Sequence, residues 1–315
     1  MGLIIFLLVL ILALGAVLYA WSAKMTADAE AAVPQAGQID PVQGGAIHFV
    51  EMGPSDAPTI VLIHGIAAQL QHWTYAVAER LAEDFHVIAL DRPGCGYSER
   101  ERDELAALPE QARMIWEFLD ARGVEKPVLA GHSLGGALSL AMALQRPDGA
   151  GALALVAPLT HFQSEVDPIF KGLEIRSKTL RRVIAHTIAG PMGRATAGKV
   201  IAHAFVPEPP IDDFLLGAGA ALGLRPKAFV TASCDLVMLE HVIGVQQTRY
   251  EELTLPRGVL YGDGDALLSP TLHGRPMEGL GFDYEELSGR GHMLPMTAPE
   301  ETEAFIRRMA AQARG

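Results

Sequence analysis

The stretch Gly131-His132-Ser133-Leu134-Gly135-Gly136 lies between an apolar run and a run of small, helix-forming residues. It fits the pattern G-x-S-x-G, in which a strand turns sharply into a helix with serine at the apex. Gly131 and Gly135 lack a Cβ and therefore allow a tight turn. This predicts a nucleophilic Ser133 with an exposed hydroxyl. The N–H of Leu134, at a helix N-terminus, would stabilise an oxyanion. An ordinary β–α turn that contains a serine is the alternative.

Short apolar strands alternate with helices from residue 45 to 158 and from 234 to 315. Strands are expected at residues 45–52 (an edge strand), 59–63, 86–90, 127–130, 151–157, 258–261 and 282–287. Helices are expected at residues 71–83, 105–122, 137–145, 234–251, 270–279 and 299–311. This alternation predicts an α/β fold with a mostly parallel central sheet and helices on both faces. Ligands bind such sheets at the carboxyl ends of the strands, where His64, Asp91 and Ser133 all fall.

Between residues 159 and 233 the strand pattern stops. Helical segments there are broken at Gly190-Pro191 and at Pro207-Glu208-Pro209-Pro210. We expect a helical cap over the site, inserted between two parts of the α/β core, residues 45–158 and 234–315. The run 215–224 either lines an apolar pocket or packs between helices.

Residues 3–20 are apolar throughout, and Trp21 follows at the position of a bilayer interface. Such a run is long enough to span a membrane. The alternative, a cleaved signal peptide, has a shorter apolar core and begins with Lys or Arg. We therefore predict a single-pass transmembrane anchor at residues 1–22 and a flexible linker at residues 23–44. With Lys24 as the only nearby basic residue, the catalytic domain is equally compatible with either side of the membrane.

Composition restricts the possible partners. The chain has 315 residues, half of them hydrophobic, and a formal net charge of −12. This charge argues against nucleic-acid binding and against electrostatic docking to anionic lipid. The two cysteines, Cys95 and Cys234, form no disulfide framework, and no Cys/His pair has zinc-finger spacing. No metal and no organic cofactor is predicted.

A serine hydroxyl needs a base within hydrogen-bond reach, and that base needs an orienting carboxylate. His292, in the glycine-rich loop after the last expected strand, is the candidate base. Asp265, in the loop after the preceding strand, is the candidate acid. The chain order Ser133, Asp265, His292 is the one found in hydrolases built on this kind of sheet.

Five short motifs occur in the right order along residues 45 to 313. They are His64-Gly65, Asp91-Arg92-Pro93-Gly94-x-Gly96-x-Ser98, the Gly131–Gly135 elbow, Gly262-x-x-Asp265 and Gly291-His292. With them the chain resembles the α/β-hydrolase fold superfamily, in its esterase- and lipase-like group with an inserted cap. The resemblance implies that the acid stands three residues after the glycine, which favours Asp265 over Asp263, although Asp263 stays open. The backbone N–H of Ile66 is expected to be the second oxyanion donor.

The sequence thus predicts a membrane-anchored serine hydrolase that cleaves hydrophobic, lipid-like carboxylic esters. A carbon–carbon bond hydrolase or haloperoxidase-like esterase with the same triad is an alternative. A non-catalytic ligand-binding or scaffold protein is another. Around the site, His132 is expected to be structural and to point away, His64 to brace its loop, and Asp91 to stabilise its own turn.

Overall fold

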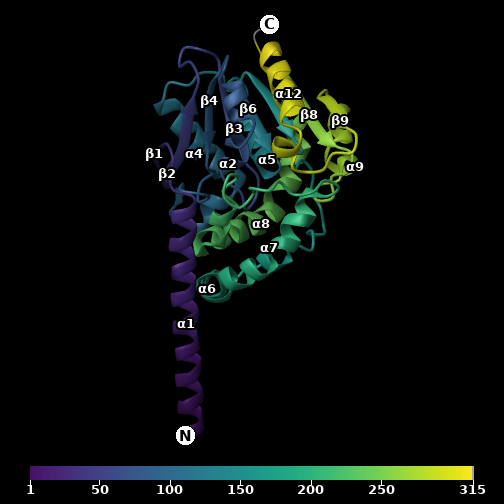
Figure 1. Cartoon of the computed structure of the whole chain (residues 1–315). Helices are drawn as coiled ribbons and strands as arrows, with labels where there is room; N and C mark the ends of the chain where they lie inside the picture. The colour runs from purple at the N-terminus through teal and green to yellow at the C-terminus, as the bar shows by residue number, and fades with distance from the viewer. Residues whose placement is uncertain (314–315) are drawn as a thin grey trace.

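One sheet runs through the centre of the protein (Figure 1). The computed structural model describes residues 1–313, and within them the sheet has nine strands. In spatial order they are β1 (Gln38–Val42), β2 (Gly45–Met52), β4 (His86–Leu90), β3 (Thr59–Ile63), β6 (Val128–His132), β7 (Ala152–Val156), β8 (Arg257–Gly262) and β9 (Asp283–Leu287), with β5 (Glu99–Arg100) paired to β2. All neighbours from β4 to β9 are parallel, whereas β2 is antiparallel to its partners. The predicted α/β fold with a mostly parallel sheet is confirmed.

Helices cover both faces of this sheet. Alternate residues of β3 point to opposite sides, so that Val61 and Ile63 join one apolar cluster while Ile60 and Leu62 join the other. The first cluster includes α4 (Leu108–Ala121) and α5 (Leu134–Gln145), and the second includes α3 (Ala78–Leu81) and α12 (Pro299–Gln312). The remaining short core helices are α2 (Gln71–Thr74), α9 (Pro270–His273), α10 (Arg275–Glu278) and α11 (Leu294–Thr297), with 3₁₀ turns at Asp103–Ala106 and Gln247–Glu252.

Most predicted core elements are confirmed, and β3 and β4 have the predicted bounds. The prediction of an edge strand at residues 45–52 is wrong, because β1 lies outside β2. Pro41 in β1 has no N–H to donate, which suits an edge position. The helices expected at residues 71–83 and 270–279 are each interrupted and form two short helices.

The cap consists mainly of α6 (Lys178–Ile184), a π-helical turn (Ala185–Ala189), α7 (Gly190–Phe205) and α8 (Pro226–Gln246), with 3₁₀ turns at Lys171–Leu173 and Ala220–Leu224. The helix break predicted at Gly190-Pro191 does not occur. The wider π turn precedes Pro191, where the proline ring would otherwise clash with the preceding turn of an α-helix. The helix expected at residues 234–251 begins earlier than predicted, and α8 crosses the predicted cap boundary at residue 233 without interruption.

The N-terminal helix α1 (Gly2–Ala32) projects from the domain (Figure 1). The prediction that residues 23–44 are a flexible linker is wrong, since α1 continues to Ala32 and β1 follows. Met25, Ala29 and Val33 recur every four residues and are buried. Contacts of α1 with the π turn and with α7 show that this buried stripe faces the cap. Helical periodicity therefore overrides the loop-like composition of this segment.

Candidate active site

The turn that carries Ser133 is strained. Ser133 joins β6 to α5 with φ 56° and ψ −122°, a conformation that costs a non-glycine residue about 1–3 kcal/mol. Its N–H donates to the carbonyl of Val156 at 3.0 Å. A Cβ on Gly131 would lie 2.4 Å from the carbonyl oxygen of Gly135, and one on Gly135 would lie 2.2 Å from that of Ile63. Close backbone approach therefore requires both glycines of the motif.

Two backbone segments converge on this serine. Leu134 is the first residue of α5, so its N–H has no acceptor in the preceding turn of helix. The loop after β3 passes directly beside Ser133, because a Cβ on Gly65 would lie 2.9 Å from the serine Cβ and 3.3 Å from its Oγ. Ile66 follows in this loop. The structure therefore brings the loop of the second predicted oxyanion donor to the candidate nucleophile.

His292 and Asp265 meet at the same edge of the sheet. Nδ1 of His292 lies 2.7 Å from Oδ2 of Asp265. The other carboxylate oxygen, Oδ1, accepts the N–H groups of Leu267 and Leu268, each at 2.9 Å. These two bonds hold the carboxylate in one orientation, so it can in turn orient the imidazole.

Asp263 is engaged elsewhere. Its carboxylate accepts the hydroxyl of Ser288 at 3.0 Å and the N–H of Gly289 at 2.7 Å, both on the solvent side. The geometry thus pairs His292 with Asp265, the acid favoured by the resemblance.

The candidate catalytic side chains are almost fully enclosed. Ser133 is 7%, Asp265 7% and His292 3% exposed. An apolar cluster of Phe205, Ala218, Met293 and Met296 packs the cap onto the loop after His292. Within residues 1–313 no hydrogen bond joins the serine hydroxyl to the imidazole. Such a contact commonly tightens only when substrate is bound.

His132 packs against the candidate base, and the expectation that it points away from the site is wrong. The two imidazole rings lie 4.8 Å apart between centroids. Nε2 of His132 lies 3.0 Å from the carbonyl oxygen of His292, so this nitrogen carries the proton and donates. Burial and the nearby His292 hold the pKa of His132 well below its usual value. A neutral His132 therefore supports the loop of His292 without adding charge beside it.

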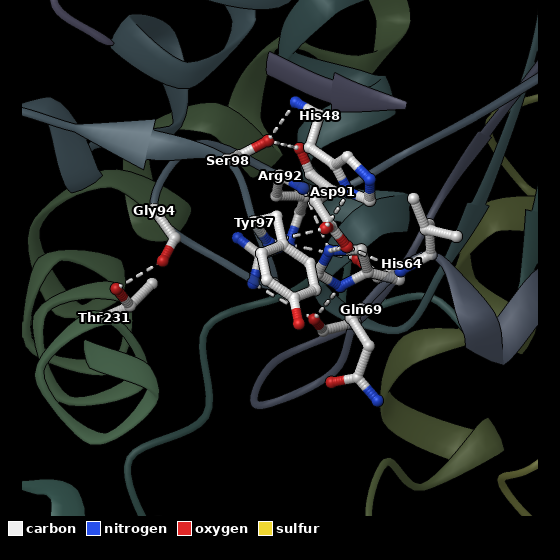
Figure 2. Close-up of polar contacts among 12 residues, drawn as sticks. His48, His64, Gln69, Asp91, Arg92, Gly94, Tyr97, Ser98 and Thr231 are labelled. Carbon is white, nitrogen blue, oxygen red and sulfur yellow. Dashed lines mark hydrogen bonds and ion pairs between the residues drawn. The ribbon is translucent and has the colours of Figure 1, made fainter. Parts of the chain in front are cut away.

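The loop that carries Ile66 is braced by His64 and Arg92 (Figure 2). Nε2 of His64 accepts the N–H of Arg92 at 2.9 Å, so Nδ1 carries the proton and donates to the carbonyl of Gly65 at 2.8 Å. Burial and the guanidinium of Arg92 lower the pKa of His64 to about 3. That guanidinium also donates to the carbonyls of His64 and Gly65 at 3.1 and 3.0 Å. The loop-bracing role predicted for His64 is confirmed.

Asp91 fixes both its own turn and the neighbouring loop. It accepts the N–H of Tyr97 at 2.8 Å and that of Leu70 at 2.7 Å, and it bonds Nδ1 of His48 at 2.6 Å (Figure 2). Burial alone would raise the pKa of Asp91, but the contacts with His48, His64 and Tyr97 outweigh it and lower that pKa. The predicted turn-stabilising role is confirmed.

Sequence reasoning missed three supporting side chains. His48 bonds Asp91 from β2, while Gln111 and Asp235 contact Nη1 of Arg92, each at 2.9 Å. His48 stands between the apolar residues Ile47 and Phe49, where a buried polar side chain needs a partner. The position of His48 between two apolar residues is a signal that the sequence does contain. The sequence does not indicate which residue His48 bonds.

The part of the chain that the structure describes contains no candidate metal site. No group of three or more His, Cys, Asp or Glu side chains within residues 1–313 is arranged to hold an ion.

Comparison with known proteins supports the same fold. The family model described as "alpha/beta hydrolase fold" matches residues 58–199. A structure of "a membrane phospholipase A, a novel bacterial virulence factor" superposes with a TM-score of 0.71 and 25% identity, covering 100% of both chains. The "Dihydrolipoyllysine-residue acetyltransferase component of acetoin cleaving system" of Pseudomonas putida is 28% identical over 93% of this chain and 76% of its own length. "Probable esterase PIR7A" of Oryza sativa subsp. indica is 27% identical over 80% of this chain and 96% of its own length.

Several other curated relatives are matched over less than half of their own length. Fold, elbow and relatives together define a hydrolase-type enzyme. The chain has the α/β-hydrolase fold, and its relatives and structural neighbours include esterases and a lipase.

Proposed function

We propose that this enzyme is a serine hydrolase that cleaves carboxylic esters through an acyl-enzyme. Ser133 attacks the ester carbonyl, His292 takes the proton and returns it to the leaving alcohol, and Asp265 stabilises the imidazolium. The N–H groups of Leu134 and Ile66 stabilise the tetrahedral oxyanion. Water, activated by the same histidine, then releases the acid. The observation that carries the proposal is the 2.7 Å contact of His292 with Asp265, at the sheet edge that also bears the strained Ser133.

Hydrophobic, lipid-like esters are the proposed substrate class. The cap presents Phe205 and Ala218 against Met293 and Met296, next to the candidate base. This apolar cover favours an acyl chain over a charged substrate. The structural neighbour titled a membrane phospholipase A supports the same class.

The helix α1 is long and apolar enough to be a membrane anchor or a signal sequence, with a mean hydropathy of 3.1. We propose a single-pass anchor whose span lies within residues 1–22. The second half of α1 is part of the folded domain, because Met25 and Ala29 are buried and Glu30 pairs with Arg225 of the cap at 3.1 Å.

The test is labelling of the full chain with a fluorophosphonate probe, together with hydrolysis of short p-nitrophenyl esters. Ser133→Ala should abolish both. Ser288→Ala, a change to an exposed serine, is the matched control and should leave both unchanged. Labelling that survives in Ser133→Ala would show that another residue is the nucleophile.

A further inference from the structure

A cavity of about 260 Å³ lies between the cap and the core. Its wall includes Arg100 of β5, Arg102 just after it, Arg182 of α6, His186 of the π turn and Lys227 at the start of α8. None of the five proposed catalytic and oxyanion residues lines it. It is therefore a separate space from the active site, and nothing in the proposed reaction uses it.

The surroundings of this cavity carry an excess of positive charge. Asp103 is shared between two guanidiniums, those of Arg181 at 3.0 Å and Arg182 at 2.7 Å. Asp235 is likewise shared, between Arg92 at 2.9 Å and Arg100 at 2.7 Å. Each carboxylate balances only one of its two partners. Two positive charges are thus left over beside the cavity, although the whole chain has a net charge of −12.

Two further cations on the wall have no ion-pair partner among residues 1–313. The ammonium of Lys227 donates only to the carbonyl of Gly96, at 3.3 Å. Burial and the nearby Arg225 lower the pKa of Lys227 by more than the carboxylates of Asp91 and Glu99 raise it. The guanidinium of Arg102 is exposed, and Glu101 is the one unpaired carboxylate on the same wall. An anion in the cavity would restore the balance that the protein lacks.

The cavity is joined to the membrane-proximal part of the molecule. His186, on its wall, stacks on Tyr19 of α1 with ring centroids 5.9 Å apart. Tyr19 and Trp21 end the apolar run of α1, and such aromatic residues favour the level of lipid headgroups. If α1 spans the bilayer as proposed, the cavity lies at the height of the lipid phosphates.

We propose that this cavity binds the phosphate of a glycerophospholipid headgroup and thereby docks the cap on the membrane surface. Arginine and lysine side chains are the usual partners of phosphate oxygens. The overall negative charge disfavours general adsorption to anionic lipid. At a local site with unpaired cations, a single anionic headgroup is attracted and does not meet this overall repulsion. The inference rests on the proposed membrane anchor and is independent of the proposed ester hydrolysis.

Native mass spectrometry of the full chain in a non-ionic detergent tests the proposal. The Ser133→Ala background prevents turnover, so that a lost lipid signal cannot be due to hydrolysis. The probes are phosphatidylglycerol and a diacylglycerol with the same acyl chains. We expect one retained phosphatidylglycerol and at least about tenfold less diacylglycerol, since the latter has no phosphate to form charge-assisted bonds. Equal retention of the two lipids would overturn the proposal.

The variant Arg102→Gln/Lys227→Gln should reduce phosphatidylglycerol retention about tenfold. Lys199→Gln, at an exposed lysine of α7, is the matched control and should retain it fully. Arg102→Gln alone, a surface change that leaves folding intact, should give a smaller loss. Equal retention by Arg102→Gln/Lys227→Gln and the control would contradict the assignment.

Glycerol phosphate, added as a competitor, distinguishes lipid from free phosphate. Displacement of lipid only at a large molar excess supports a membrane headgroup as ligand. Binding of glycerol phosphate as tight as that of the lipid would overturn the membrane source. Fluorophosphonate labelling reports on the catalytic serine separately, so the two proposals fail independently.

Discussion

The loop after β3, which carries Ile66, and the cap above it are held by different interactions. The loop is fixed by short hydrogen bonds among buried polar groups of His64, Asp91 and Arg92. The cap is joined to the core by shared carboxylates such as Asp235 and by an apolar cluster around Phe205. Hydrogen bonds fix the direction of individual N–H groups, whereas apolar packing is non-directional. Under the proposed function, the core would hold the reacting groups in place and the cap would select the substrate.

The two regions meet at Arg92. Its guanidinium donates to the carbonyl of Gly65, next to Ile66, and pairs with Asp235 on α8 of the cap. Arg92 thus links the cap directly to the loop after β3. Variants of residues in the core and of residues that hold the cap test whether each region can be perturbed without the other.

The largest expected effect is at the acid. Asp265→Asn should lower kcat about 10⁴-fold with an unchanged fold, because the imidazole loses its orienting charge and its tautomer. Asp263→Asn is the matched control and should change kcat only slightly, since that carboxylate bonds Ser288 and Gly289 instead. Steady-state ester hydrolysis measures both. A larger loss in Asp263→Asn would reverse the assignment.

Asp235→Asn should produce the next largest effect, on stability. It leaves the buried guanidiniums of Arg92 and Arg100 without their shared counter-charge, which costs about 3–5 kcal/mol. Thermal unfolding measures this loss. Glu252→Gln removes an exposed pair with Arg249 and should change the stability by less than about 1 kcal/mol. If Asp235→Asn lowers kcat without lowering the midpoint of unfolding, Asp235 acts on the loop and contributes little to attachment of the cap.

The core could be predicted from the sequence because the residues that determine each of its elements are neighbours in the chain. The β-branched run 59–63 forms β3 with the predicted bounds, and the glycines at 131 and 135 lie where backbone contact excludes a Cβ. The order of Ser133, Asp265 and His292 led to the observed pairing of the last two. In each case a few neighbouring residues determine the geometry.

The cap and α1 could be predicted less well from the sequence, because contacts between residues far apart in the chain determine their structure. The segment after residue 22 has the composition of a linker, yet Met25 and Ala29 become buried only when the cap is present. The partner of His48 is 43 residues away, in a turn whose position depends on the whole sheet. Neither propensity nor spacing contains this information.

Acidification should lower the stability of the protein through its buried, neutral histidines. Burial lowers the pKa of His64 to about 3 and that of His72 to about 4, from 6.5. Since the unfolded chain binds these protons first, stability falls as the pH drops below about 6.5, by up to about 1.4 kcal/mol per pH unit for each group. Denaturant unfolding between pH 7 and pH 5 measures this slope.

His72→Phe isolates one of these protons, because the ring packs against Phe214 and a phenyl ring preserves that contact. The variant should show a shallower loss of stability on acidification than the wild type. An identical slope would mean that His72 is protonated in both states and contributes nothing to the pH dependence.

The smallest expected effect is at the contact between α1 and the cap. Glu30→Gln removes the ion pair with Arg225, in which the glutamate side chain is 45% exposed, so solvent screening limits the cost to about 0.5–1 kcal/mol. In a nanodisc this should lower the midpoint of thermal unfolding by about 1–3 °C. A loss as large as that in Asp235→Asn would make α1 a structural part of the cap. The expected small loss would instead leave the buried apolar stripe of Met25 and Ala29 as the main attachment of α1 to the cap, because the burial of these side chains does not depend on the charge of Glu30.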